Sequence, residues 1–140
     1  MSVLSQAATA GQSLDDANVS KLVGDALPTE DYRGQRILLI VPDQTRTAPV
    51  GLLFKRIYRQ IGEASAALDV MIALGTHPPM SEEAVCERLE ISLAERRGEY
   101  AKVQFHNHEW DNHDALRRSA SSLPRTSRSC PADASRWNCR

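Results

Sequence analysis

The fold of this chain is decided by residues 37–46, which read ILLIVPDQTR. Residues 36–41 are rich in β-branched side chains and too few for a buried helix, so they predict a strand. Because the apolarity of residues 37–41 is uninterrupted, they also predict a sheet that is covered on both faces. The polar loop that follows begins with Pro42 and Asp43 and ends with Arg46.

Two further strands are expected, and each ends in a polar loop. Residues 68–74 predict the second strand, which is followed by GTHPPM at residues 75–80. Residues 101–105 alternate between apolar and polar side chains, which predicts a third strand with one exposed face. The loop after it, residues 106–113, reads HNHEWDNH. The carboxyl ends of parallel strands share one edge of a sheet, so we expect the three loops to converge there.

Helices are expected between these strands. Residues 48–62 carry one wide apolar stripe at helical spacing, and weaker patterns predict helices at 14–27 and, capped by Ser81, at 82–90. Residues 91–99 are charged and are expected to be irregular. The order α-β-α-β-α-β predicts an α/β fold, a Rossmann-like three-layer sandwich with a partial parallel sheet.

Composition excludes several classes of protein. The chain has 140 residues with 17 Lys and Arg against 18 Asp and Glu, a net charge of -1, which gives no electrostatic case for a nucleic-acid partner. No apolar run approaches the roughly 20 residues that cross a bilayer, and the N-terminus does not resemble a signal peptide. The 3 cysteines include no close pair, which argues against a disulfide framework or a zinc motif. We therefore expect a cytoplasmic protein without a membrane partner.

The two ends of the chain differ in composition from its middle. Residues 1–13 are small and polar, and residues 115–140 are rich in Arg and Ser without an apolar period, so both segments are expected to be disordered. Residues 14–114 form the expected domain, which is incomplete. The abrupt change near Asn112 suggests a truncation or a change of reading frame.

The loop after the first strand carries groups that suit an anion. Arg46 can hold a carboxylate or phosphate through two charge-assisted hydrogen bonds, and free N–H groups at the start of the next helix can add to them. Asp43 can orient a neighbouring base or accept a hydrogen bond from a ligand hydroxyl. The alternative is an ordinary turn in which Asp43 caps the helix and Arg46 is solvated.

The loops after the second and third strands contain histidines. His77 is suited to proton transfer to or from a hydroxyl, whereas the alternative is a loop histidine bonded to a carbonyl. His106 and His108 would face the same side of an extended segment, which is the one argument for a metal. Their spacing matches no standard zinc pattern, so we predict a polar loop and no metal site. Glycine-rich phosphate motifs and a GxSxG elbow are absent.

Three motifs together carry a family resemblance: VPDQTRTAP at residues 41–49, ALGTHPPM at 73–80 and NHEWDN at 107–112. Over residues 14–112 the chain resembles the N-terminal domain of the nickel-dependent lactate racemase family, and the tail beyond does not. The resemblance implies a racemase or epimerase of 2-hydroxyacids. It also implies a nickel pincer nucleotide as the cofactor, which takes a hydride from the substrate α-carbon and returns it to either face.

The resemblance also assigns roles to four residues. His77 matches the histidine that removes the hydroxyl proton, and Arg46 matches the arginine that holds the substrate carboxylate. Asp43 matches the aspartate beside them, and Thr45 is implied to help line the pocket. The resemblance gives no defined role to the loop at 106–113.

The chain departs from the family in what it lacks. The second catalytic histidine, the lysine that links to the cofactor and the nickel-ligating histidine all lie beyond the matching region. We therefore expect a fragment that alone holds neither cofactor nor activity. Two alternatives remain open. One is a split enzyme whose C-terminal half is encoded separately and docks on the unfinished sheet edge. The other is a non-catalytic Rossmann-like module that binds a small anion or a partner chain.

Overall fold

The computed structural model describes residues 7, 8, 10 and 14–112. The compact unit that contains the fold ends at Glu109. The disorder expected for residues 1–13 and 115–140 lies outside the described residues, apart from positions 7, 8 and 10.

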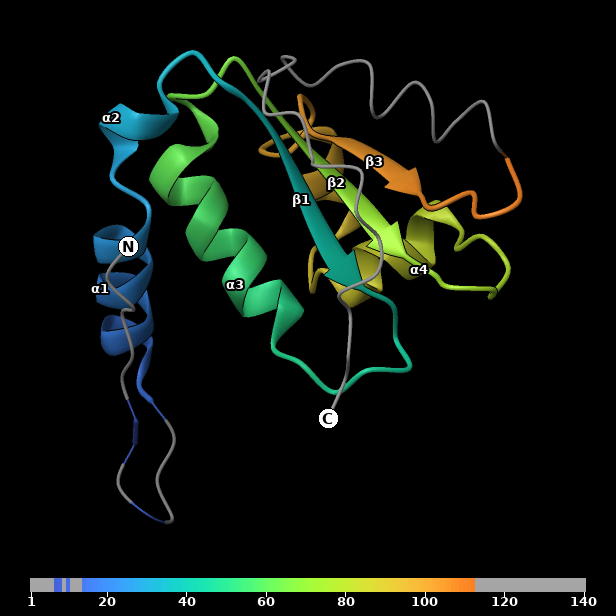
Figure 1. Cartoon of the computed structure of the whole chain (residues 1–140), viewed down its shortest axis with the longest axis horizontal. Coiled ribbons are helices and arrows are strands. Elements are labelled where there is room, and N and C mark those ends of the chain that lie inside the picture. The colour runs from blue at the N-terminus through green and yellow to red at the C-terminus, as the bar shows by residue number, and fades with distance from the viewer. Residues whose placement is uncertain (1–6, 9, 11–13, 113–140) are drawn as a thin grey trace, which may run out of the picture. The chain divides into compact units, whose positions relative to one another are not determined.

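Three parallel strands form the sheet, in the order β1-β2-β3 (Figure 1). β1 (Arg36–Pro42) pairs with β2 (Ala67–Ala73), which in turn pairs with β3 (Gln104–Asn107). The expected α/β class and parallel sheet are therefore confirmed. Because the strands are parallel, their carboxyl ends and the loops that follow them lie at one edge of the sheet.

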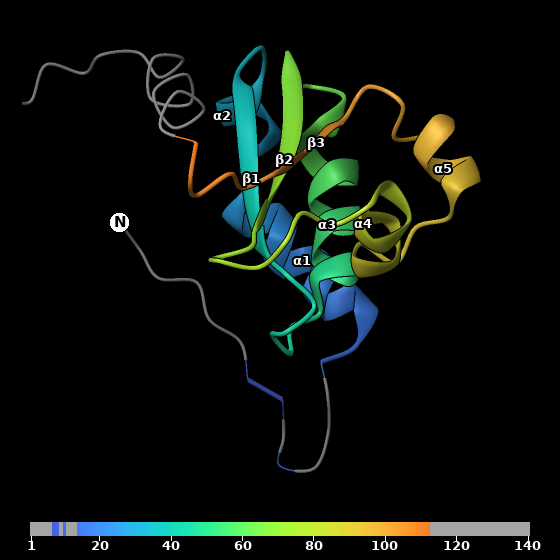
Figure 2. The same cartoon turned by 90° about the vertical axis from the view of Figure 1, so that its right-hand side faces the viewer.

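The helices that connect the strands cover one face of this sheet. α3 (Val50–Ile57), α4 (Glu82–Arg88) and α5 (Leu93–Arg97) lie on the same side of it (Figure 2). This follows from the strand order, because two crossovers of the same hand that step in the same direction place their helices on one face.

The described residues do not supply the second helical layer of the expected three-layer sandwich. On the outer face of β1, Leu38 is 45% exposed and Ile40 is 62% exposed. The expectation that this apolar strand is covered on both faces is therefore wrong for the part of the chain that the structure describes. We call this surface, centred on Leu38 and Ile40, the open face of the sheet.

The other face packs on a continuous hydrophobic core. Val70 and Ile72, on the central strand, have no exposed surface, and Leu89 at the end of α4 is equally buried. Phe54 of α3 contacts Tyr100, with ring centroids 5.1 Å apart. The wide apolar stripe seen in the sequence thus faces the sheet, as its spacing predicts.

The N-terminal helices pack beside α3. α1 (Asp16–Ala26) starts where the side chain of Asp15 accepts a hydrogen bond from the Asn18 N–H at 2.7 Å. It ends at Ala26, and its C-cap Leu27 stands directly before Pro28, close to the expected boundary at 27. The single turn α2 (Thr29–Tyr32) was not expected from the sequence.

The helix expected over residues 48–62 is built from two segments. α3 begins at Val50, with Pro49 as an N-cap that makes no side-chain hydrogen bond, and it continues as the π-helical turn η1 (Tyr58–Gly62). A Cβ added at Gly62 would lie 2.7 Å from the ring of Tyr58, so this close approach requires glycine.

Two expectations about the last third of the fold are wrong. Residues 91–99 are not irregular, because they contain α5, which opens with a reciprocal capping box between Ser92 and Glu95. The third strand starts at Gln104 rather than at 101, because the preceding residues form a turn in which the Val103 N–H donates to the Tyr100 carbonyl at 3.0 Å.

Candidate functional site

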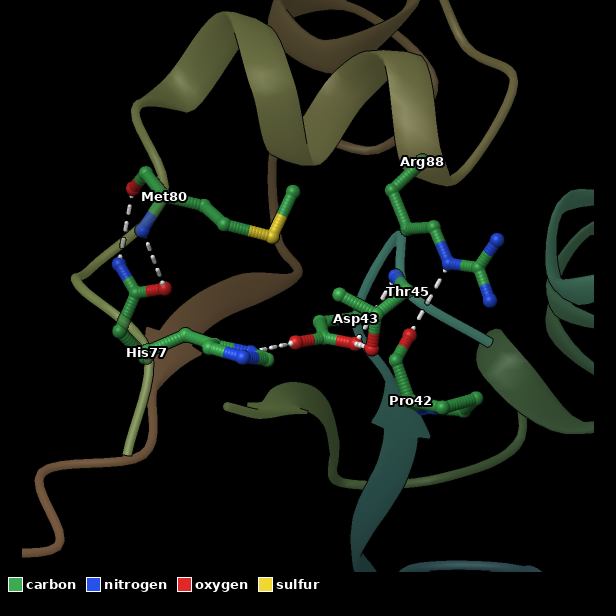
Figure 3. A network of polar contacts seen from close by, with 7 residues as sticks. Pro42, Asp43, Thr45, His77, Met80 and Arg88 are labelled. Carbon is green, nitrogen blue, oxygen red and sulfur yellow. Dashed lines mark hydrogen bonds and ion pairs between the residues drawn. The ribbon is translucent and has the colours of Figure 1, made fainter. Parts of the chain in front are cut away.

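The strand register brings together two of the candidate side chains. Pro42 and Ala73, the last residues of β1 and β2, are paired, so the loops that carry Asp43 and His77 leave the sheet side by side. The Nδ1 atom of His77 lies 2.7 Å from the Oδ2 atom of Asp43 (Figure 3). These residues are 34 positions apart in the chain, and only the parallel pairing makes them neighbours.

Asp43 is the buried member of this pair, with 4% of its surface exposed. Its Oδ1 atom accepts hydrogen bonds from the Thr45 hydroxyl at 2.5 Å and from the Thr45 N–H at 3.1 Å. The hydroxyl bond of Thr45 and the contact with His77 lower the pKa of Asp43 to about 2, against the opposing effect of burial. The carboxyl group is therefore ionised at neutral pH.

An ionised carboxylate determines how the imidazole of His77 is used. Because an ionised Asp43 can only accept hydrogen bonds, Nδ1 of His77 carries the proton in this contact. In the neutral imidazole, Nε2 is then the nitrogen with the free lone pair. The side chain of His77 is 54% exposed, so Nε2 is accessible to a ligand. This arrangement, in which a buried carboxylate orients a histidine, suits a general base.

The backbone around His77 is held at both ends of its loop. Gly75 adopts a φ of 59°, and the N–H of His77 donates to the carbonyl of Leu74 at 3.0 Å, which closes a tight turn. At the far end, Met80 exchanges two hydrogen bonds with the side-chain amide of Asn107, at 3.1 and 2.9 Å. The histidine is thus presented from a short, anchored loop.

Arg88 anchors the loop that carries Asp43, and sequence reasoning missed it. From the last turn of α4, its Nε donates to the carbonyl of Pro42 at 3.0 Å (Figure 3). Its Nη2 donates to the carbonyl of Arg46 at 2.9 Å. No sequence motif marks Arg88, because its acceptors are main-chain carbonyls more than 40 residues away. Asn107 belongs to the motif NHEWDN at residues 107–112, and its position at the end of β3 could have marked it as a candidate.

A cavity of about 400 Å³ opens beside the His77–Asp43 pair. It is lined by residues of the β1–α3 loop, the β2–α4 loop and the start of α4: Asp43, Gln44, Thr45, Leu74, His77, Pro78, Pro79, Met80, Ser81 and Ala84. Thr45 is one of these lining residues, and its hydroxyl donates to the Oδ1 atom of Asp43.

Arg46 is placed differently from the other candidates. It belongs to the same loop, and its N–H donates to the carbonyl of Asp43 at 3.4 Å. Its side chain is exposed, and Arg46 is not among the residues that line the cavity. The structure therefore brings His77, Asp43 and Thr45 together and leaves the guanidinium of Arg46 outside their cluster.

The third loop does not form a metal site with the others. His106 is exposed on the open face of the sheet, whereas Asn107 faces the core side. Among the described residues, no group of three or more His, Cys, Asp or Glu side chains is arranged to hold a metal ion. The cavity lining holds a single histidine and no lysine. These residues do not fit a nickel nucleotide by themselves, and no reaction step through such a group follows from them.

The fold and this site place the chain among α/β proteins with a polar site at the carboxyl edge of a parallel sheet. Comparison with known families then gives a particular answer. A model of the lactate racemase N-terminal domain matches residues 5–132, and the chain belongs to this family. The match extends beyond residues 14–112, over which the three motifs carried the resemblance.

Among solved structures, a protein from Thermotoga maritima has 31% sequence identity to this chain and superposes with a TM-score of 0.59. The alignment covers 73% of this chain and 23% of that one, so the chain spans about a quarter of the length of its relative. No curated protein matches the chain. Within the described residues, no helix is both long and apolar enough to cross a membrane.

Proposed function

We propose that this chain supplies the proton-handling half of the active site of a 2-hydroxyacid racemase or epimerase, of the lactate racemase type. The observation that carries the proposal is the contact between His77 and the buried, ionised Asp43 at the edge of a cavity. Membership of the lactate racemase family supports the substrate class, because lactate is a 2-hydroxyacid.

In this proposal His77 acts on the substrate hydroxyl. Its Nε2 takes the proton as the O–H bond breaks, which increases the tendency of the adjacent carbon to give up its hydride. Asp43 stabilises the imidazolium that forms, and Thr45 keeps Asp43 ionised through its hydroxyl bond. On the return step the same imidazolium gives the proton back to the oxygen.

Arg46 is the proposed partner of the substrate carboxylate. Its backbone is fixed through the carbonyl bonded by Arg88, while its side chain is exposed at the rim of the site. An extended arginine can turn towards a bound carboxylate and form two parallel hydrogen bonds. This would fix the orientation of the hydroxyacid with its hydroxyl at His77.

Racemisation needs more than this half-site. The hydride must leave and return on both faces of a planar keto acid, which calls for a second base and a hydride acceptor. Apart from His77 and its partner Asp43, the residues that line the cavity offer no second base and no hydride acceptor, so we propose that the chain alone is inactive and that further polypeptide completes the site. Leu38 and Ile40 on the open face of the sheet support this, because a parallel sheet is normally covered on both faces.

Ligand titration of the full chain tests the proposal. L-lactate and D-lactate are added to labelled protein, and the ring signals of His77 are followed by NMR, with propionate as the ligand that lacks the hydroxyl. We expect weak binding of both lactates, about 1 mM or ~4 kcal/mol, because one wall of the pocket is missing. Propionate should leave the His77 ring signals unchanged.

Matched variants complete this test. His77→Gln should abolish the response to lactate, whereas His106→Gln, which changes an exposed histidine on the open face, should leave it intact. If propionate and lactate act alike and Arg46→Ala removes both responses, the chain is a small-anion-binding module instead. Racemisation of lactate by the chain alone would contradict the half-site.

A further inference from the structure

Asn107 makes an unusually complete contact with the loop that carries His77. It is the last residue of β3, and its partner in the sheet is Ile72. Its Oδ1 accepts from the N–H of Met80 at 3.1 Å and its Nδ2 donates to the carbonyl of Met80 at 2.9 Å. The side-chain amide therefore pairs with one residue of another loop in the way that a neighbouring strand would (Figure 3, dashed lines at Met80).

The sequence between His77 and Met80 explains why this contact matters. Pro78 and Pro79 have no N–H group and have restricted backbone angles. Met80 therefore carries the first main-chain donor after His77. Beyond it, Ser81 caps α4 by accepting from the Ala84 N–H at 3.2 Å. Because Pro78 and Pro79 are conformationally restricted, a displacement of the Met80 backbone would also displace His77.

The opposite end of the loop is held by fewer hydrogen bonds. Gly75 sits at a positive φ with no atom within 4 Å of the place that a Cβ would take. The turn there relies on the single bond from the His77 N–H to Leu74. The pairing of Asn107 with Met80 is thus the stronger of the two anchors that hold the imidazole over Asp43.

We propose that Asn107 is a positioning residue that aligns His77 with Asp43 by fixing the backbone of Met80. The inference rests on the proposed role of His77 as the base and adds to it a residue on the third strand. It gives the loop at residues 106–113 a role in the site that requires no metal ion. The aligned state is the one in which Nδ1 of His77 donates to Asp43 and Nε2 is free.

The ring nitrogens of His77 provide a direct measurement. In the full chain, at a pH at which the imidazole is neutral, ¹⁵N chemical shifts distinguish the proton on Nδ1 from the proton on Nε2. We expect the wild-type chain to show mainly the Nδ1–H form. Asn107→Ala should lose this preference and show the mixed signals of a solvated histidine.

Two further variants keep the test decisive. Gln104→Ala removes an exposed amide from the same strand and should leave the His77 signals as in wild type. Asn107→Asp keeps the acceptor for the Met80 N–H and loses the donor, so it should show an intermediate loss; it replaces Asn107→Ala if that variant does not fold.

A purely structural role for Asn107 has a different signature. The urea midpoint would fall in Asn107→Ala or Asn107→Asp while the His77 tautomer stayed as in wild type, and this result would overturn the proposal. The lactate titration remains separate. If lactate fails to bind wild type, the proposed function is lost, but the effect of Asn107 on the His77 ring can still be measured.

Discussion

Two isoleucines on neighbouring strands allow the open face of the sheet to be tested. Ile72 on β2 has no exposed surface, whereas Ile40 on β1 is 62% exposed. Replacing each with alanine removes the same atoms from opposite faces of one sheet. The two variants therefore lose the same chemical groups and differ only in how deeply those groups are buried.

The structure gives the expected size of each effect. Ile72→Ala removes fully buried methyl groups and leaves a cavity, so it should lower the free energy of unfolding by about 2–5 kcal/mol. Ile40→Ala removes atoms that are mostly in contact with water and should cost about 1 kcal/mol or less. The first change is a large part of the ~5–15 kcal/mol that a small domain possesses.

Urea unfolding of the full chain, followed by far-UV circular dichroism, measures both values. The slope of the transition should be the same for both variants, so that the midpoints compare directly. Equal costs for the two substitutions would refute the reasoning, because they would mean that the face around Ile40 is covered in solution. A cost for Ile40→Ala that rises only when a partner polypeptide is added would support completion of the sheet by that partner.

Three other predictions concern charge and backbone. The pKa of Asp43 is about 2 in the folded chain, against 3.8 for an unperturbed aspartate, so its contribution to stability is complete above pH 3.8 and is lost as the pH falls towards 2. The urea midpoint of Asp43→Asn should therefore change less than that of wild type between these pH values. Gly51→Ala should lower the free energy of unfolding by about 1–3 kcal/mol, because the added Cβ would lie 2.5 Å from side-chain carbons of Glu90. Gly24→Ala should be neutral or stabilising by about 0.5–1 kcal/mol, because the nearest atom to its added Cβ lies 3.7 Å away. Thermal unfolding distinguishes these two, and an equal effect would contradict the close approach. Gly75→Ala should lower the free energy of unfolding, measured in urea, by about 1–2 kcal/mol, because alanine disfavours the φ of 59° found at this position. A stabilising effect would show that the turn does not need this conformation.

Much of the secondary structure was predictable because its signals are local. The apolar run at residues 37–41 and the helical stripe within residues 48–62 each reflect the side of an element that faces the core. α5 was missed although its signal was present, since Ser92 and Glu95 stand at the spacing of a capping box. The start of β3 was misplaced because alternation alone does not show where pairing with β2 begins.

The candidate site was only partly predictable. Asp43 and His77 were found because each follows an apolar strand, and the parallel arrangement implies that such loops converge. The distance between them, and the low pKa of Asp43 that results from it and from Thr45, required the fold. Arg88 could not have been found, because its role depends on carbonyl groups that come within reach of its side chain only once the chain has folded.

By itself, the sequence determined the approximate positions of the three strands and of α1, α3 and α4, that the sheet is parallel, and which loops carry the candidate site residues. These are properties of neighbouring residues and of the order in which elements follow one another. The tertiary structure alone decided that Asp43 contacts Nδ1 of His77, that Arg88 and Asn107 anchor the two loops, and that the described residues leave one face of β1 uncovered. The physical reason is that hydrogen bonds and burial between distant segments depend on strand register and on the hand of the crossovers, and no contiguous stretch of residues records either.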